Sequence, residues 1–322
     1  MDHVCRICAN AADNQTFRCA EKMFGFGGEF IYFQCGRCGC LQTEAVPADL
    51  SRYYPPHYYS FHLQAVPQQG LKAQLAGWRD YWVLSGRGAD AWFAKRLAAH
   101  APLAALRQLP MRAEMRVLDV GCGRGELLSI LHRAGFGELV GVDPFLPADV
   151  EVVPGLRVRS QPLESLRQEF DLIMFHHVLE HIEDGRGILS AACGRLRPNG
   201  RILIRLPTAD GAAWDRYREN WVGLDAPRHF FLHTRRSLEL LASQAGLGVE
   251  RCWCDSGALQ FWVRELYQSG LPLVSAEGQT ARATDRFTPQ RLRGFAREAR
   301  ALNAAGRGDN LAAVLVRLER TV

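Results

Sequence analysis

Short apolar runs alternate with helical stretches over most of the chain from about Met115 to its end. The runs lie at residues 116–121, 138–143, 156–160, 170–176, 201–207, 248–254 and 311–319. The segments between several of them carry apolar residues at helical spacing and end in glycine. Strands separated by helices are typical of a parallel sheet. The pattern therefore predicts an α/β fold with a doubly wound, mostly parallel, seven-stranded sheet.

The chain before this sheet divides into two further parts. Residues 1–46 hold paired cysteines and glycines and few helix signals, whereas residues 47–110 carry helical patterns after an aromatic-rich start. We expect a small N-terminal module at 1–46, a helical linker or lid at 47–110, and the α/β domain at 111–322, with a helical insertion near 271–309.

Composition narrows the class of protein. Hydrophobic residues make up 48% and charged residues 23% of the 322 residues, and the formal net charge is +5. No run approaches the roughly 18 apolar residues that cross a bilayer, and the start lacks the features of a secretory signal, so we expect a cytoplasmic protein without a membrane partner. The mild charge argues against a dedicated nucleic-acid binder and suits an anionic small molecule.

A glycine-rich turn follows the first strand, in VLDVGCGRGELL. The residues of interest are Asp119, Gly121, Gly123 and Gly125, with Asp143 at the end of the next strand. Glycines allow a tight turn and a close approach of the backbone to a ligand, and the acid suits the two ribose hydroxyls of an adenosine cofactor. The spacing is G-x-G-x-G and not the dinucleotide G-x-G-x-x-G, which disfavours a nicotinamide dehydrogenase and favours S-adenosyl-L-methionine (adenosylmethionine).

Two CxxC pairs lie in the N-terminal module, and we expect their four thiolates to bind a structural Zn²⁺ in a zinc ribbon. The predicted ligands are Cys5, Cys8, Cys35 and Cys38. Free thiols or a redox pair remain alternatives, and Cys19 or Cys40 is able to replace one of the ligands.

Two polar clusters follow the fourth and fifth strands, at the edge where open α/β sheets bind ligands. The first contains His176, His177, Glu180 and His181, and the second contains Trp221, Asp225, Arg228 and His229. We expect His181 or His229 to be a general base, with Glu180 orienting or assisting it. Helix capping and loop packing are the alternative roles of the two histidines.

The first cluster also spells an inverted zinc-peptidase motif, His177-x-x-Glu180-His181. That motif needs a continuous helix, whereas here it begins directly after a strand, so we do not expect a metallopeptidase.

The segments LDVGCGRGELL, VGVDP, FDLIMFHHVLEHIED and RPNGRILIRLP together resemble class I methyltransferases, in order and separation. The resemblance covers about Met115 to Leu247 and implies a Rossmann-like methyltransferase domain. By this resemblance Asp119 and the three glycines hold the methionine end of adenosylmethionine and Asp143 holds the ribose. Glu164 then lies where family members contact the adenine, and we also assign His176 to the cofactor site.

The cysteine module followed by RYYPPHYYS, and later WVGLDAPRH, resemble a subgroup that includes sugar C-methyltransferases. Those proteins carry a further carboxy-terminal domain that this chain lacks, so the resemblance is partial. Four tyrosines in this region form a lid or pack between the module and the domain: Tyr53, Tyr54, Tyr58 and Tyr59.

The sequence thus predicts an adenosylmethionine-dependent methyltransferase that acts on an oxygen or carbon of a small molecule such as a sugar, nucleotide-sugar or glycan precursor. One alternative is an rRNA or tRNA methyltransferase. The absence of an Asn/Asp-Pro-Pro-Tyr element after the fourth strand argues only against methylation of a base amino group. The other alternative is a non-catalytic zinc-ribbon interaction protein. The sequence does not indicate the oligomeric state.

Overall fold

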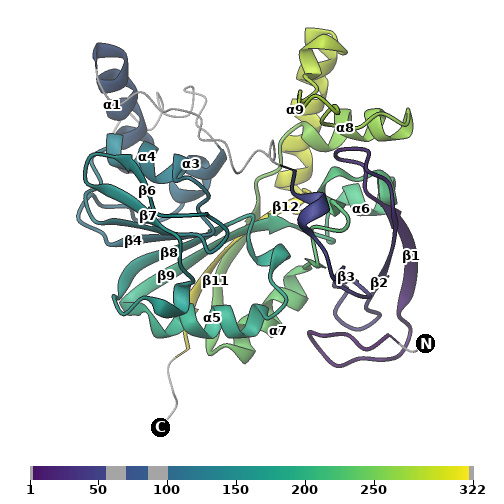
Figure 1. The fold of residues 1–322 in the computed structure, drawn as a ribbon, viewed down its shortest axis with the longest axis horizontal. Coiled ribbons are helices and arrows are strands. Elements are labelled where there is room, and N and C mark those ends of the chain that lie inside the picture. The colour runs from purple at the N-terminus through teal and green to yellow at the C-terminus, as the bar shows by residue number, and fades with distance from the viewer. Residues whose placement is uncertain (1–2, 56–69, 86–100, 319–322) are drawn as a thin grey trace.

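An eight-stranded sheet forms the centre of the molecule in the computed structural model, which describes residues 3–55, 70–85 and 101–318 (Figure 1). The strand order is β11-β12-β9-β8-β4-β5-β7-β6. The bounds are β4 Val117–Val120, β5 Leu139–Val142, β6 Val150–Val153, β7 Leu156–Arg159, β8 Phe170–His176, β9 Leu196–Pro207, β11 Leu247–Cys254 and β12 Asn310–Arg317. All seven predicted strands form, and β6 adds an eighth as an antiparallel partner of β7.

The sheet is mostly parallel, as predicted. Strands β4, β5, β7, β8 and β9 run in one direction, and β12 is antiparallel to both of its neighbours. The chain extends from β4 first to β5 and later to β8 on its other side. The carboxyl ends of β4 and β8 therefore meet at the point where the strand order reverses, which is where sheets of this type bind ligands.

Helices cover both faces of the sheet, which explains why its strands read as continuous apolar runs. Along β8, Leu172 and Met174 pack into the core under α1 (Leu71–Ser85), α3 (Ala101–Leu106) and α4 (Glu126–Arg133). The alternate residues Ile173 and Phe175 point to the other face, into the core with α5 (Gly185–Gly194) and α7 (Arg235–Gln244). This period of two is the geometry of a strand buried on both sides.

The Pro-Asn-Gly sequence at residues 198–200, a combination typical of turns, lies within a strand. Helix α5 ends at Gly194 and β9 begins at Leu196, so the three residues lie within β9. Asn199 has a positive φ of 62°, and the pairing register with β8 shifts between Phe170 and Leu172. These residues therefore produce an irregularity in β9 and do not form a turn between two elements. Asparagine is suited to this position because it tolerates the left-handed conformation.

The N-terminal residues form a second, four-stranded sheet that includes a strand of the main domain. Strands β1 (Gln15–Ala20), β2 (Glu29–Gln34) and β3 (Leu41–Thr43) are antiparallel, and β10 (Phe231–Leu232) pairs with β3. Two long-range hydrogen bonds join the same regions: Tyr32 Oη donates to the carbonyl of His229, and Thr234 Oγ1 donates to that of Cys38. The N-terminal module is therefore anchored on the segment that precedes α7.

The C-terminal part adds α6 (Ala212–Tyr217), α8 (Leu259–Gln268) and α9 (Pro289–Ala304), and the last two lie together beside the N-terminal sheet in Figure 1. Thr288 caps α9, and Phe295 of α9 stacks on Phe261 of α8 with ring centroids 5.6 Å apart. Within the described ranges we find no helix with the length and apolar character that a bilayer span requires.

Candidate active site

The glycine loop between β4 and α4 needs glycine for steric reasons. Gly121, Gly123 and Gly125 have positive φ angles of 66°, 53° and 83°. A Cβ on Gly121 would lie 2.6 Å from a methyl carbon of Val178, which is closer than atoms pack. The backbone conformation costs an ordinary residue roughly 1–2 kcal/mol, so this loop is built from glycine in order to turn directly against the residues that follow β8.

Asp143 holds the glycine loop in place. One carboxylate oxygen accepts a hydrogen bond from Gly123 N at 2.9 Å and the other accepts from Phe145 N at 3.0 Å. The Phe145 side chain is 83% exposed next to this carboxylate, although it is large and apolar. The end of β5 thus offers an acidic group and an uncovered aromatic face side by side, which suits a ribose and an attached base.

Asp119, near the end of β4, is buried behind the loop with only 3% of its surface exposed. Burial and the nearby Asp143 raise the pKa of Asp119 to about 8. A buried carboxyl with a raised pKa favours a cationic ligand, because a neighbouring positive charge stabilises the ionised form. The ammonium group of adenosylmethionine supplies such a charge.

Two further predicted cofactor residues lie at the carboxyl ends of neighbouring strands. Glu164 is exposed in the short 3₁₀ helix after β7 (Leu163–Ser165). His176 ends β8, and neither of its ring nitrogens has a hydrogen-bond partner among the described residues. Burial lowers the pKa of His176 well below its usual value, so the ring is neutral. Their contact with a cofactor remains a prediction.

The segment after β8 turns sharply and does not continue as a helix. His177 has a φ of 56°, and only one 3₁₀ turn, Leu179–His181, follows. Glu180 is fully buried there, with Oε1 3.3 Å from Nδ1 of His177. Its second oxygen, Oε2, is also buried and has no hydrogen-bond partner in the described parts of the chain. The geometry agrees with our expectation that no peptidase helix forms.

The two predicted base candidates lie next to each other. The rings of His181 and His229 are 4.6 Å apart between centroids in an edge-to-face arrangement. His181 Nδ1 lies 2.9 Å from the carbonyl of Arg228, and His229 Nδ1 lies 2.9 Å from that of Gly223. Burial and His229 lower the pKa of His181 to about 4, so this ring is neutral near pH 7. The turn after β8 and the loop before β10, which are far apart in the sequence, are thus in contact through these two histidines.

Arg228 connects the loop that carries His229 to the N-terminal part of the chain. Its guanidinium is fully buried and pairs with Asp225 through two hydrogen bonds of 2.9 and 2.6 Å. It also donates to Glu21 Oε1 at 2.8 Å and to the carbonyl of Tyr53 at 2.9 Å. Burial of a charge requires this degree of pairing, so Arg228 fixes the loop that carries His229 against the N-terminal residues.

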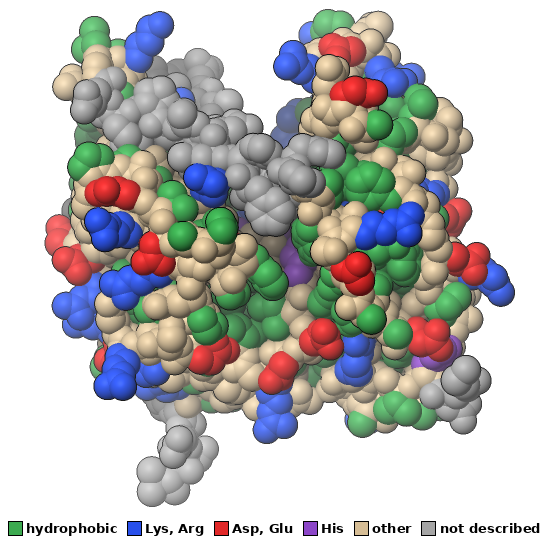
Figure 2. Space-filling view, viewed as in Figure 1, with side chains coloured by type: hydrophobic (Ala, Val, Ile, Leu, Met, Phe, Trp, Pro, Cys, Tyr) green, Lys and Arg blue, Asp and Glu red, His purple; other side chains and the backbone are tan. Residues whose placement is uncertain are grey.

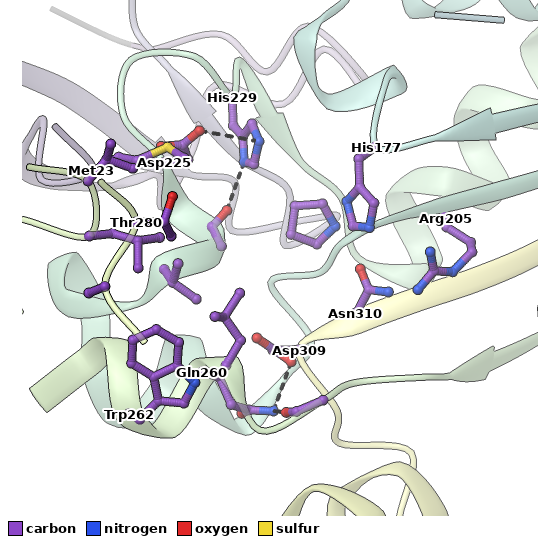
Figure 3. Close-up of a pocket in the computed structure, with 18 of the residues that line it drawn as sticks. Met23, His177, Arg205, Asp225, His229, Gln260, Trp262, Thr280, Asp309 and Asn310 are labelled. Carbon is purple, nitrogen blue, oxygen red and sulfur yellow. Dashed lines mark hydrogen bonds and ion pairs between the residues drawn. The ribbon is translucent and has the colours of Figure 1, made fainter. Parts of the chain in front are cut away.

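A pocket of about 510 Å³ opens beside His177 and His229, between the sheet edge, α8 and the N-terminal module (Figure 3). In Figure 2 a histidine lies deep in the hollow between the two halves of the molecule. The pocket's apolar wall includes Met23, Phe24, Val222 and Trp262. Its polar wall consists of Arg205, Asp255, Gln260, Asp309 and Asn310.

The sequence interpretation missed this polar wall. Arg205 is 4% exposed and its guanidinium makes a 2.5 Å ion pair with Asp255. Gln260 donates to Asp309 at 2.8 Å, while its own side-chain oxygen is buried without a partner among the described residues. The one available signal was a charged residue within the apolar run RILIRLP, since arginine in a buried strand needs a partner.

Two of the four tyrosines that the sequence analysis assigned to a lid or to packing lie within the described residues, and they differ in their surroundings. Tyr53 is buried and packs edge-to-face on Phe30 of the N-terminal sheet, whereas Tyr54 Oη lies 3.3 Å from Nδ1 of His181. Tyr58 and Tyr59 lie outside the described residues.

The structure brings the four predicted metal ligands together. Their sulfur atoms all lie within 4.8 Å of one another, with 3.6 Å between Cys5 and Cys38 and 3.5 Å between Cys8 and Cys35. A tetrahedral zinc with bonds of about 2.3 Å separates its sulfurs by roughly 3.8 Å, so the group fits this ion. In the described residues neither Cys19 nor Cys40 belongs to the group.

Comparison with known proteins finds similarity to methyltransferases over the glycine loop and the central strands of the large sheet. Residues 93–251 match a family model described as a methyltransferase domain. A ubiquinone biosynthesis O-methyltransferase of Bradyrhizobium diazoefficiens is 32% identical over 109 residues, which cover 31% of this chain and 42% of the relative. The enzyme of the same name from Acinetobacter baylyi is 32% identical over 104 residues, covering 29% and 43%. The chain therefore spans less than half the length of these relatives.

Among solved structures, the chain is similar to the 1,6-didemethyltoxoflavin-N1-methyltransferase of Burkholderia thailandensis. The identity is 18%, the TM-score is 0.42, and the match covers 79% of this chain and 92% of the other.

Proposed function

We propose that this chain, which carries a class I adenosylmethionine-dependent methyltransferase domain, transfers a methyl group to an oxygen or carbon of a small molecule. The proposal depends chiefly on one juxtaposition. The glycine loop with Asp143 and the cluster of Glu180, His181 and His229 lie at the same edge of the sheet, where β4 and β8 end. The proposed site for the methyl donor therefore lies next to side chains that are able to deprotonate a methyl acceptor.

The transfer is an in-line displacement at the methyl carbon. The acceptor atom forms a bond to that carbon while the carbon–sulfur bond breaks, and the positively charged sulfonium becomes a neutral thioether. Much of the rate comes from alignment of the two reactants. A hydroxyl or carbon acid must also lose its proton, and we assign this step to the neutral imidazole of His181 or His229, with Glu180 assisting.

The acceptor occupies the pocket beside His229 in this proposal. One wall offers hydrogen-bonding groups on Arg205, Asp255 and Asn310, and the other offers the aromatic face of Trp262. Sugars combine several hydroxyls with an apolar ring face, so a sugar-like acceptor suits both walls. The relatives named as O-methyltransferases favour oxygen as the methylated atom.

The four N-terminal cysteines hold a structural Zn²⁺ in this proposal. Four protein ligands leave no open position for a substrate, which is the arrangement of structural zinc sites.

Isothermal titration of the zinc-loaded protein with adenosylmethionine tests the donor site. We expect micromolar binding that Asp143→Ala weakens at least tenfold, because the ribose loses its acceptor and the glycine loop loses its brace. Asp285→Ala, an equal truncation at an exposed site on the chain, serves as the matched control. NADH in a parallel cell should not bind.

The result of this titration distinguishes the proposed function from its two alternatives, an interaction protein and an RNA methyltransferase. A folded, zinc-loaded protein that binds no adenosylmethionine would contradict the proposal and favour an interaction protein. If the donor binds, turnover with a panel of hydroxylated small molecules and with transfer RNA distinguishes a small-molecule enzyme from an RNA enzyme.

A further inference from the structure

Acidic side chains outnumber arginines around the acceptor pocket. Three of the described residues that line it are acids: Asp225, Asp255 and Asp309. Arg205 is the one lysine or arginine that lines it within the described ranges, and it pairs with Asp255 at 2.5 Å. Arg228, which lies behind the wall, pairs with Asp225 at 2.6 Å. Asp309 has no ion pair in the described parts of the chain, so these arginines leave its charge unbalanced.

Asp309 is held in the pocket wall by neutral hydrogen-bond donors. Trp221 Nε1 donates to it at 3.0 Å and Gln260 Nε2 at 2.8 Å, and the hydroxyl of Ser256 also bonds to the carboxylate. A carboxylate has about four acceptor positions, so these three donors leave room for a further donor on a ligand. Burial raises the pKa of Asp309, and a cation next to the carboxylate stabilises its ionised form.

Gln260 supplies a second, independent observation. It lines the same pocket and is 1% exposed, and its side-chain oxygen Oε1 is buried with no partner among the described residues. The bond from Nε2 to Asp309, drawn in Figure 3, determines the orientation of the amide and leaves Oε1 as an acceptor. A buried acceptor without a donor is costly. Asp309 and Gln260 together therefore lack a positively charged group that donates hydrogen bonds.

An ammonium group meets both requirements, because it carries one positive charge and three hydrogen-bond donors. Trp262, two residues after Gln260 in α8, also lines the pocket. The face of an indole ring attracts a cation, so the apolar wall is compatible with the same group.

We infer that Asp309 and Gln260 bind a protonated amino group of the acceptor, which makes the substrate an amine-bearing small molecule such as an amino sugar. The ammonium group pairs with Asp309 and donates a hydrogen bond to Oε1 of Gln260. It serves recognition and is not the methylated atom, because a protonated nitrogen has no lone pair with which to attack the methyl carbon. This inference rests on the proposed function, since it specifies the acceptor that the same pocket takes.

Two probes of similar size and different charge test the site. The cation is trans-2-aminocyclohexanol, and the neutral probe is trans-cyclohexane-1,2-diol. We expect the full, zinc-loaded chain, titrated by NMR at neutral pH, to bind the amine roughly tenfold more tightly than the diol, since hydrogen bonds to charged groups are the stronger ones. Asp309→Asn should abolish this preference, because it keeps the shape and removes the charge. Asp285→Asn makes the same change on an exposed residue and should leave the preference unchanged.

Gln260→Met tests the second acceptor without a change of charge. It should lower the preference for the amine several-fold, because Oε1 is lost. Circular dichroism verifies the fold of each variant, and Gln260→Met decides the matter if Asp309→Asn does not fold.

The site is refuted if the wild type binds neither probe or binds both equally, or if the folded variants keep the preference of the wild type. Adenosylmethionine titration on the same samples separates the two proposals. Donor binding without a preference for the amine removes the ammonium site and leaves the methyltransferase. A preference for the amine without donor binding removes the methyltransferase proposal and leaves a cation-binding pocket.

Discussion

At the scale of single residues, the burial of Asp119 suits the cationic ligand that we propose for it. It is enclosed behind the glycine loop, and both its burial and the charge of Asp143 raise its pKa to about 8. Because the folded-state pKa lies above the unfolded value, the folded protein keeps this proton between about pH 4 and 8, and stability falls as pH rises through that window. A cationic ligand reverses the preference by stabilising the carboxylate.

We therefore predict that adenosylmethionine binding releases a proton from Asp119. The dissociation constant should fall by nearly tenfold between pH 6 and pH 7, since the ionised fraction rises about tenfold over that unit. Calorimetry in two buffers of different ionisation enthalpy measures the proton release.

Asp119→Asn is the control, because it keeps the shape and removes the titration. Affinity that does not change with pH in the wild type, or equal proton release in this variant, would contradict the assignment.

At the scale of elements, the loop between α6 and β10 connects the two sheets. It carries Asp225, Arg228 and His229, and its continuation as β10 completes the N-terminal sheet. The buried ion pair of Arg228 with Glu21 joins residues that are 207 positions apart. Glu21 also accepts hydrogen bonds from Phe24 N and Phe26 N, so the same network shapes the apolar wall of the pocket.

We predict that Arg228→Ala lowers the free energy of unfolding by about 3–5 kcal/mol, because it leaves two carboxylates without their buried partner. Urea denaturation followed by fluorescence measures the change. Arg18→Ala is the control, because it removes an ion pair with Glu29 whose two side chains are 76% and 58% exposed. This substitution should change the free energy of unfolding only slightly. If the two substitutions lowered the free energy of unfolding equally, the buried ion pairs of Arg228 would contribute no more to stability than an exposed pair.

At the scale of the whole molecule, the N-terminal module and the α/β domain share one site. Cys5, Ile7 and Phe33 belong to the same apolar core as α5 and α7, and Phe24 of the module lines the acceptor pocket. The donor loop lies on the α/β domain. In the proposed function, the donor site and the acceptor pocket therefore depend on different parts of the chain.

We predict that Cys35→Ser combined with Cys38→Ser removes one zinc per chain and abolishes methyl transfer, because the module no longer holds the pocket wall. The affinity for adenosylmethionine should stay within about twofold, since the glycine loop and Asp143 belong to the large sheet and its connections. Elemental analysis, turnover and calorimetry give the three quantities.

The paired change Cys193→Ser and Cys252→Ser tests two partly exposed cysteines outside the module and should leave all three unchanged. Retention of zinc by the first double variant would overturn the ligand assignment.

The sequence by itself determined the features whose residues lie close together in the chain. The strands follow from apolar runs, the donor loop from glycines whose positive φ angles ordinary residues avoid, and the cysteine group from two short CxxC turns. These depend on local backbone geometry, so their spacing alone predicted them.

Tertiary structure decided what depends on segments brought together from far apart. The convergence of Glu180 and His181 with His229, the polar wall of Arg205, Asp255 and Asn310, and the pairing of β10 with β3 all arise from the sheet order and its connections. No local pattern encodes these contacts, because burial of apolar faces and pairing of buried charges are satisfied only in the folded chain.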